Sequence, residues 1–208
     1  MSGVIEGERL DARGPERVEA FSDGVFAIAI TLLVLEIQLP SLGENPSPQS
    51  LLNSLGSLWP SYIGYLVSFL TIGNAWINHH NLFRLVGRVS HSLMITNLLL
   101  LMAIGFLPFP TALLADTLGK PGEQVGVVVY AGVFVFTAVM FNLLWLSVKK
   151  VLKPGVPRSV IEAINRSYLL GPPISAAALV IAFVNPTIGI LVIGGLMLLY
   201  LLPRASGT

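Results

Sequence analysis

The stretch RVEAFSDGVFAIAITLLVLEI, residues 17–37, decides the fold, because a short polar motif leads directly into an apolar run that is long enough to cross a bilayer. A hydrocarbon core about 30 Å thick needs about 20 residues of helix. Gly14-Pro15-Glu16 stands just before it, and a proline at the first helical position followed by an acid is a helix start signal. The sequence therefore predicts a membrane helix from about Val18 to Ile37, ended by Pro40.

Further along the chain, other segments are apolar and long enough for a membrane helix or for one arm of a short hairpin. Asn185-Pro186, a turn signal, separates the last two and predicts a tight helical hairpin between them. The predicted fold class is an all-α integral membrane protein with six transmembrane helices per subunit. After the first, these spans run from about Leu55 to Ile77, Leu93 to Leu114, Val125 to Val148, Tyr168 to Val184 and Thr187 to Leu202.

The composition is also that of a membrane protein. Of the 208 residues, 54% are hydrophobic and 11% are charged, with a mean hydropathy of +0.79, whereas soluble domains carry about 25% charged residues. A net charge of +1 without a basic, aromatic-rich patch argues against a nucleic-acid partner. Because the chain has no cysteine, the sequence excludes disulfides, thiolate metal sites and a cysteine nucleophile.

The distribution of Lys and Arg predicts the orientation, since cytoplasmic loops hold the excess of these residues. With the N-terminus inside, Lys120 alone among the 12 Lys and Arg falls in an outer loop. If the number of helices were wrong by one, Lys and Arg would fall on both sides of the membrane. We therefore expect a single six-helix domain over residues 1–208 with both termini in the cytoplasm, where residues 1–16 form an N-terminal segment and residues 203–208 a tail.

Apolar and polar faces separate on the first predicted helix. At about 100° per residue, Ile28, Leu32 and Leu35 fall within about 60° of one another, and Thr31 lies beside them. The pair Ser22-Asp23 points at least about 120° away from Ile28. This helix therefore carries an apolar stripe and, near its inner end, a separate polar face.

Hydrogen-bonding side chains recur at the same predicted depth on the next two helices. The second ends in Trp76-Ile77-Asn78-His79-His80-Asn81-Leu82-Phe83, and the third opens at His91 and contains Asn97. A carboxylate such as that of Asp23 needs partners when it is buried in a membrane protein. If the second and third helices pack beside the first, these side chains are the candidate partners.

With these residues in view, the sequence resembles the transmembrane protein 175 family of potassium channels. The run Arg17-x-x-x-Phe21-Ser22-Asp23, near the start of the first span, looks like the signature of that family. Trp76-x-x-His79-His80-x-x-Phe83 and Pro108-Phe109-Pro110-Thr111 are similar to the family as well. The resemblance covers essentially the whole chain, because the number of spans, their orientation and the loop lengths agree.

The resemblance implies a potassium-permeable cation channel in the plasma membrane of a bacterium, with single-repeat subunits that assemble as a homotetramer. It implies that the first helix of each subunit lines a central pore, with Ile28 as the hydrophobic constriction. Thr31, Leu32 and Leu35 extend this lining outward. The remaining motif residues are implied to tie the first helix to the second and third, and they are Arg17, Phe21, Ser22, Asp23, Trp76, His79 and His80. From its predicted depth we expect Asn97 to join this network.

We expect only modest selectivity for K⁺ over Na⁺. The chain has no Thr-Val-Gly-Tyr-Gly loop, and so it lacks the carbonyl filter of ordinary potassium channels. Four copies of Ile28, Thr31 and Leu35 would instead form a narrow, mostly dry constriction at which an ion sheds water, while the Thr31 hydroxyls replace part of it. The expected partners are three further copies of the chain in the homotetramer, the lipid bilayer and monovalent cations, with no cofactor and no metal beyond K⁺ in transit.

Several of these residues have alternative roles. Thr31 can donate its hydroxyl hydrogen to the carbonyl of Ala27 instead. A metal site or a proton sensor at His79 and His80 is the alternative to structural hydrogen bonds, but adjacent helical positions diverge by about 100° and no His-Glu-x-x-His is present. Glu36 either concentrates cations at the outer mouth or is simply solvated.

Two other classes of function compete with a channel. An enzyme is disfavoured, since neither a Gly-x-Ser-x-Gly motif nor a Gly-rich phosphate loop occurs. A secondary transporter of a cation or a small solute remains as the alternative. Transporters use helices that are broken near the middle of the membrane, and Pro172-Pro173 in the fifth predicted span hints at such a break.

Overall fold

The computed structural model of the chain describes residues 14–40 and 46–201. Over these ranges the regular structure is helical, and one isolated bridge joins two of the loops. The predicted all-α class is therefore confirmed. Most of the predicted N-terminal segment (1–16) and the predicted tail at 203–208 lie outside the described residues.

The first helix, α2 (Gly14–Leu32), begins earlier than the predicted Val18 and continues as a short 3₁₀ segment, η1 (Leu33–Glu36). Pro15 and Glu16 occupy its first turn. The backbone N–H that proline lacks has no partner within the helix at this position, and the positive end of the helix dipole stabilises the acid. The start signal in the sequence thus lies inside the helix.

The second predicted span is two helices, α3 (Pro48–Ser57) and α4 (Trp59–Phe83), which meet at a bend of 45°. Pro60 accounts for the break, because a proline removes one N–H and its ring clashes with the carbonyl one turn earlier, here that of Gly56. The third span divides in the same way into α5 (His91–Phe106) and α6 (Pro108–Thr117). There Pro108 interrupts the ladder, and the N–H of Leu107 donates to the Ile104 carbonyl at 3.1 Å.

The C-terminal half contains α7 (Glu123–Val148), α8 (Arg158–Val184) and α9 (Pro186–Leu201). α8 begins well before the predicted Tyr168, because its first turns are amphipathic and the apolar-run criterion misses them. It also continues through Pro172 and Pro173. Since Pro172 has no N–H for the Tyr168 carbonyl, that oxygen accepts a hydrogen bond from Asn142 Nδ2 of α7 at 2.9 Å instead.

The predicted hairpin of the last two helices is present. Asn185 closes α8 through its own N–H, which donates to the Ile181 carbonyl at 2.8 Å, and its side-chain oxygen accepts from the N–H of Ile188 at 3.0 Å. At the crossing, a Cβ on Gly189 would lie 2.7 Å from Ala182 Cα. The two backbones therefore approach closely because this position has no side chain.

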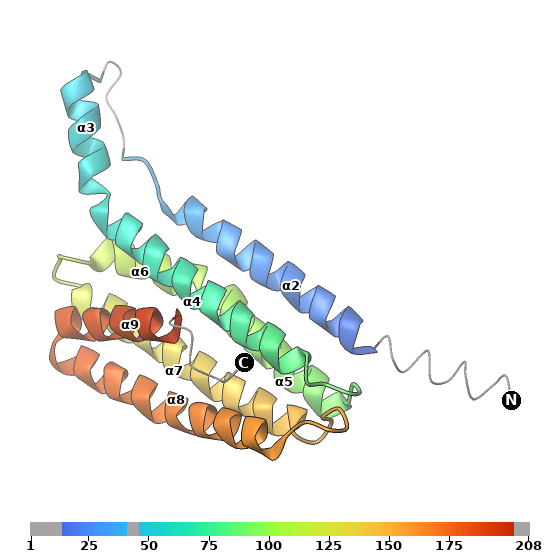
Figure 1. Cartoon of the computed structure of the whole chain (residues 1–208). Helices are drawn as coiled ribbons and strands as arrows, with labels where there is room; N and C mark the ends of the chain where they lie inside the picture. Colours follow the sequence, from blue (N-terminus) through green and yellow to red (C-terminus); the bar gives the residue numbers. More distant parts are fainter. Residues whose placement is uncertain (1–13, 41–45, 202–208) are drawn as a thin grey trace, which may run out of the picture.

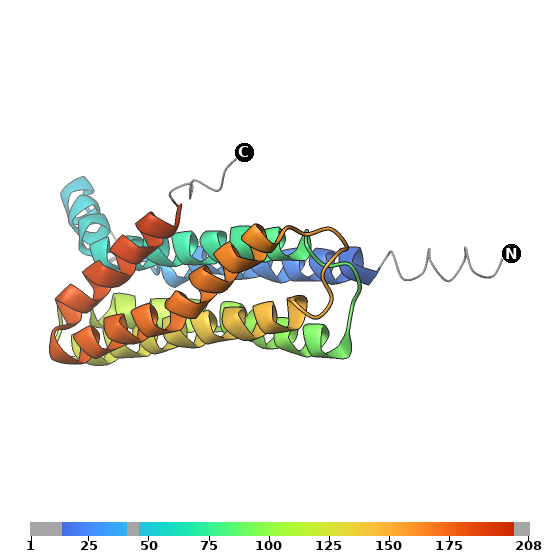
Figure 2. The same ribbon diagram turned by 60° about the horizontal axis from the view of Figure 1, so that its bottom comes forward.

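Figure 1 shows α2 at one edge of the bundle beside α4, and α8 with α9 at the opposite edge. Figure 2 shows α5, α6 and α7 as a lower layer beneath α2 and α4, with α8 and α9 running obliquely across the two layers. α2 contacts both α4 and α5, whereas α8 packs mainly on α7. One long face of α2 is consequently left uncovered by the other described helices.

Four helical segments of the described chain are long and apolar enough to cross a membrane: Gly14–Glu36, His91–Thr117, Glu123–Val148 and Arg158–Val184. The bent pair α3 and α4 would supply a fifth, and the apolar part of α9, Pro186–Leu199, is shorter. The structure thus has the membrane-spanning character that the sequence predicts, while six crossings stay a prediction.

Candidate functional site

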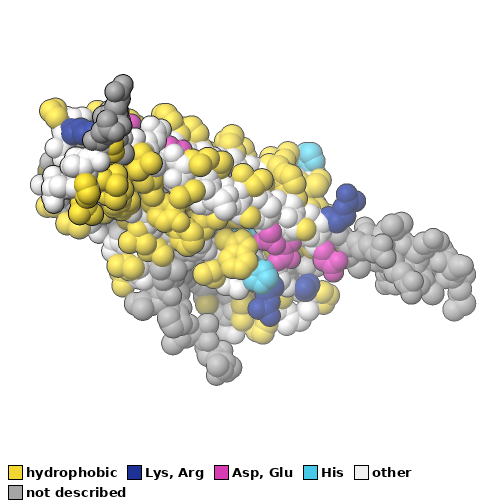
Figure 3. Space-filling view, turned by 90° about the horizontal axis from the view of Figure 1, so that it is seen from above, with side chains coloured by type: hydrophobic (Ala, Val, Ile, Leu, Met, Phe, Trp, Pro, Cys, Tyr) yellow, Lys and Arg dark blue, Asp and Glu magenta, His cyan; other side chains and the backbone are white. Residues whose placement is uncertain are grey.

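The uncovered face of α2 and η1 is an apolar stripe. Ile28 is 61% exposed and Leu35 is 67% exposed, although both belong to helices packed against the bundle. Phe26, Ala29 and Leu33, which point the other way, are at most 3% exposed. Viewed from above α2, Figure 3 shows hydrophobic side chains spread over this face and charged and His side chains gathered toward the end where α2 begins.

The other two predicted lining residues lie on the same stripe. Leu32 is 40% exposed, and Thr31 is exposed as well. The Thr31 hydroxyl lies 2.9 Å from the carbonyl oxygens of both Ala27 and Ile28, so its single hydrogen is donated to the helix backbone. The backbone hydrogen bond that was the alternative for Thr31 is therefore present, and it does not exclude a place in the pore lining. Since the hydrogen is engaged, the hydroxyl oxygen has only lone pairs left to offer, and these suit a cation and not an anion.

On its buried side, α2 is held by a chain of hydrogen bonds that runs through three helices. Ser22 Oγ donates to the Val18 carbonyl at 2.8 Å, and Asn97 Nδ2 of α5 donates to Ser22 Oγ at 2.9 Å. His79 Nε2 of α4 lies 2.8 Å from Asn97 Oδ1. Because the Asn97 oxygen can only accept, Nε2 must carry the hydrogen, which makes His79 the Nε2–H tautomer.

These three side chains are almost completely buried: Ser22 and His79 are 0% exposed and Asn97 is 1% exposed. The His79 ring stacks on Phe83 with centroids 4.3 Å apart and meets Phe26 at 5.3 Å. Its second nitrogen, Nδ1, has no hydrogen-bond partner among the described residues. The site therefore holds a neutral imidazole between aromatic rings, which fits a structural role better than a metal ligand.

A second pair of contacts joins α2 to α4 nearer the surface. Trp76 Nε1 donates to Asp23 Oδ1 at 2.8 Å, and His80 Nδ1 lies 2.8 Å from Glu19 Oε1. The indole and imidazole rings stack with centroids 5.9 Å apart. Each helix contributes residues four positions apart, and because the helices are antiparallel the two contacts lie one turn from each other.

Six of the eight predicted network residues are thus brought together, and they are Ser22, Asp23, Trp76, His79, His80 and Asn97. Arg17 and Phe21 are not: both are exposed, and within the described residues neither has a polar or ring contact. Asp23 accepts its hydrogen bond from the Trp76 indole. Sequence reasoning missed the partnership of Glu19 with His80, although Glu19 stands one turn before Asp23 and so shares its face.

A further buried polar chain, which the sequence did not reveal, joins α4, α6 and α7. Thr111 donates to the Leu107 carbonyl at 2.8 Å, so its oxygen accepts from Ser68 Oγ at 2.6 Å. Ser68 in turn accepts from Tyr130 Oη at 3.0 Å. Tyr130 is 0% exposed, and this chain satisfies it in the centre of the bundle.

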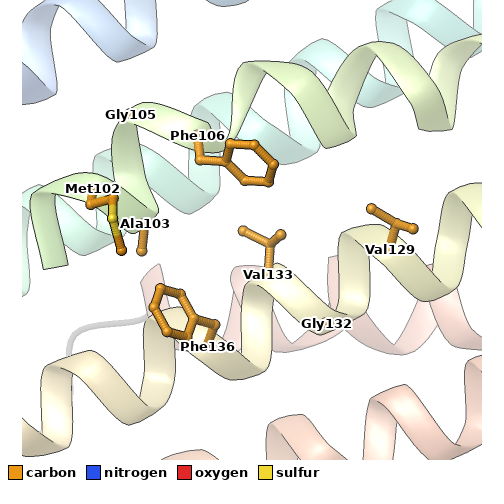
Figure 4. Close-up of a pocket in the computed structure, with 8 residues that line it drawn as sticks. All are labelled: Met102, Ala103, Gly105, Phe106, Val129, Gly132, Val133 and Phe136. Atoms are coloured by element: carbon orange, nitrogen blue, oxygen red, sulfur yellow. The ribbon is translucent and has the colours of Figure 1, made fainter. Parts of the chain in front are cut away.

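The structure also has an apolar groove of about 640 Å³ between α5 and α7 (Figure 4). Gly105 and Gly132 leave open space there, while Phe106 and Phe136 stand beside it. None of its lining side chains is polar, so the groove has no group that could bind an ion or orient a polar solute. Among the described residues, no group of three or more His, Cys, Asp and Glu is placed to hold a metal ion.

Several known proteins are similar to this chain over much of its length. The family model described as the endosomal/lysosomal potassium channel TMEM175 matches residues 17–108, which include the hydrogen-bond chain of α2, α4 and α5. A potassium channel of Chamaesiphon minutus is 46% identical over 81% of this chain and 84% of its own length. The chain belongs to the TMEM175 family.

Two further comparisons show how far the similarity extends. A potassium channel of Streptomyces collinus is 42% identical over 88% of this chain and 90% of its own length. The crystal structure of a lysosomal potassium-selective channel TMEM175 homolog from Chamaesiphon minutus superimposes with a TM-score of 0.84 at 42% identity, covering 93% of this chain and 98% of that one. The family resemblance seen in the motifs is therefore confirmed, and it extends over nearly the whole fold.

Proposed function

We propose that this chain is one subunit of a homotetrameric potassium channel in the plasma membrane of a bacterium, with six crossings per subunit and both termini in the cytoplasm. The observation that carries the proposal is the apolar stripe of α2, which is exposed on a helix whose opposite side is fixed by buried hydrogen bonds. Similar chains that are named potassium channels support the choice of ion.

In this proposal four α2 helices surround a common axis and turn their stripes toward it. Ile28 lies midway along the predicted span from Val18 to Ile37, so its four copies form a ring of branched aliphatic side chains near the middle of the membrane. Such a ring excludes most water and makes ion dehydration the main barrier. The Thr31 oxygens lie one turn outward, where their free lone pairs replace part of the lost hydration.

This arrangement selects K⁺ over Na⁺ only modestly. Na⁺ holds its water more strongly than K⁺, so a dry ring favours K⁺, but four hydroxyl oxygens do not replace the full carbonyl cage of an ordinary potassium filter. Leu32 and Leu35 continue the apolar lining toward the outer mouth, and both are exposed.

The buried contacts supply the orientation that a pore helix needs. Neighbouring residues on a helix diverge by about 100°. A rotation of α2 by one residue would therefore separate Ser22 from Asn97 and Asp23 from Trp76 together. Unpaired polar groups are costly inside a membrane protein, so these bonds hold Ile28 toward the axis.

The alternative, a secondary transporter, draws no support from the suggested break at Pro172. α8 continues through both prolines, and the freed Tyr168 carbonyl is satisfied by Asn142. No unwound, open backbone therefore offers a substrate site at that point of the described chain.

The proposal is tested by K⁺ flux from vesicles that contain Ile28→Asn. A polar ring would wet the constriction, so we expect a larger K⁺ flux or a lower K⁺/Na⁺ permeability ratio. Leu169→Asn is the matched control, because Leu169 is 71% exposed on α8, far from the stripe. A folded Ile28→Asn assembly with unchanged flux and selectivity would count against the pore assignment.

A further inference from the structure

A rigid, positively charged surface lies at the end of the bundle where α2 and α5 begin and α4 and α7 end. Two loops meet there, the α4–α5 loop (residues 84–90) and the α7–α8 loop (residues 149–157), and Figures 1 and 2 both show them side by side. The two loops carry four exposed cations, Arg84, Arg88, Lys150 and Lys153, and Arg158, which opens α8, is a fifth. We call these five residues the basic platform.

Backbone hydrogen bonds join the two loops. Val86 and Leu152 form an antiparallel bridge, in which the N–H of Gly87 donates to the Val151 carbonyl at 2.8 Å and that of Lys153 donates to the Leu85 carbonyl at 2.9 Å. Val86 and Val151 are buried beneath the bridge, at 1% and 4% exposure. The cations of both loops are therefore held on one common support.

Gly87 makes this close approach possible. A Cβ at that position would lie 3.1 Å from Lys153 Cα and 3.2 Å from the Leu152 carbonyl oxygen. A larger residue would push the loops apart and separate Arg88 from Lys153.

Within the described residues, none of the five platform side chains has an acidic partner within 4 Å, and the ion pair found there joins His80 to Glu19. Glu16 and Glu19, on the first turns of α2, are further acids at this end. Glu162, on the exposed side of α8, is the one acid within residues 84–90 and 149–166. The neighbouring Lys149 is turned inward, since its Nζ donates to Asn165 Oδ1 at 3.1 Å, and so it is not part of the platform.

The opposite end of the molecule has the opposite character. Its described ionisable residues are Glu36, Asp116 and Glu123, with Lys120 as the cation. A cluster of basic residues just beyond the ends of membrane helices attracts anionic headgroups, at about 1 kcal/mol for each Lys or Arg near the surface. Arg84 directly follows α4 and Arg158 opens α8, so the platform lies at that depth.

We propose that the basic platform binds the phosphate headgroups of anionic phospholipids in the leaflet at this end of the bundle. Charge complementarity selects the partner, and the bridged loops hold the cations in place before the lipid arrives. This inference does not depend on the pore, and it assigns a ligand to residues that the proposed ion path does not use.

The test uses the full chain reconstituted in phosphatidylcholine membranes with spin-labelled phosphatidylglycerol or spin-labelled phosphatidylcholine as probe. Electron paramagnetic resonance gives the affinity of each lipid for the protein. We expect the wild type to prefer phosphatidylglycerol and the preference to fall about fivefold for each cation removed, which is the equivalent of about 1 kcal/mol. The variants are Arg88→Gln and Lys153→Gln, one on each loop, and their combination.

Lys120→Gln is the matched control, because it removes the same charge from the other end and should keep the preference. Equal losses in Lys120→Gln and Lys153→Gln would overturn the proposal, since net charge alone would then explain the effect, and so would a wild type without any preference. Excess inorganic phosphate distinguishes a lipid headgroup from a soluble phosphate as the ligand. If it displaces the labelled lipid, the platform is a site for soluble anions and the lipid assignment is wrong. K⁺ flux of the same vesicles reports separately on the pore.

Discussion

Trp76 Nε1 donates a hydrogen bond to Asp23 Oδ1 across 2.8 Å and thereby ties α4 to α2 just before the apolar stripe that begins at Ile28. The Glu19 and His80 contact one turn away repeats the link. Together with the buried chain through Asn97, these contacts hold α2 at two depths and on two of its sides. Substitutions at Asp23 and at Asn97 therefore separate the contributions of the two sides.

Asp23→Ala should weaken assembly. It removes a charged acceptor and leaves the indole N–H of Trp76 without a partner, a loss of about 1.5–3 kcal/mol per subunit for a hydrogen bond to a charged group. The fraction of oligomer that survives heating, measured by size-exclusion chromatography in detergent, should fall. Trp76→Phe is the companion variant, and because it removes the same bond from the other side its loss should be similar. A fully assembled, fully conducting Asp23→Ala protein would remove the proposed anchoring role.

Asn97→Leu should destabilise the subunit more than a surface change on the same helix. It keeps the size of the side chain but leaves the His79 Nε2–H without an acceptor in a buried position, which costs about 1–3 kcal/mol. Thermal unfolding monitored by circular dichroism measures the difference. Thr96→Val is the control, because Thr96 is partly exposed and donates only to its own helix. Equal melting temperatures for the two variants would show that the buried chain is unimportant.

Much of this network could be anticipated, and the reason is periodicity. On any helix Ser22 and Asp23 point away from the stripe of Ile28, so the two faces of α2 follow from residue spacing alone. Which polar residue meets which could not be read in the same way. The Tyr130 and Ser68 contact joins positions 62 residues apart, and single polar residues in apolar helices carry no periodic signal.

The helix breaks could be anticipated only in part. Pro60 and Pro108 both stand within predicted spans. A proline in a membrane helix either breaks the helix or is accommodated within it, as at Pro172, where Asn142 donates to the carbonyl that the proline leaves without a donor. The outcome depends on a neighbouring helix that supplies a donor. Tertiary packing therefore decided where α3 and α6 became separate helices.

Thr31→Val should lower the K⁺/Na⁺ permeability ratio toward unity, because the ring loses four oxygens while its volume stays nearly the same. Thr31→Ser should retain most of the selectivity, since it keeps the oxygen and its hydrogen bond to the helix. Reversal potentials under bi-ionic conditions measure the ratio. If Thr31→Val and wild type reverse at the same potential, the hydroxyl ring has no part in selection. Discrimination as strong as that of carbonyl-filter channels in the wild type would contradict the modest selectivity proposed above.

Gly189→Ala should loosen the hairpin of α8 and α9. The added Cβ would lie 2.7 Å from Ala182 Cα, and such overpacking costs about 1–3 kcal/mol. Gly194→Ala is the matched control in the same helix, because nothing lies within 4 Å of a Cβ there and alanine favours a helix. Limited proteolysis near Asn185 should accelerate in the first variant only. The same rate in both would show that the crossing tolerates a methyl group.

The most direct test of the pore uses Ile28→Cys, since the native chain has no cysteine and the new thiol is the only one present. A charged methanethiosulfonate reagent that modifies a ring of thiols at the constriction should abolish most of the K⁺ current of the reconstituted channel. Leu169→Cys, equally open but on α8, should be modified without loss of current. A current that persists after mass spectrometry shows the thiol of the Ile28→Cys variant to be fully modified would place α2 away from the ion path and contradict the account.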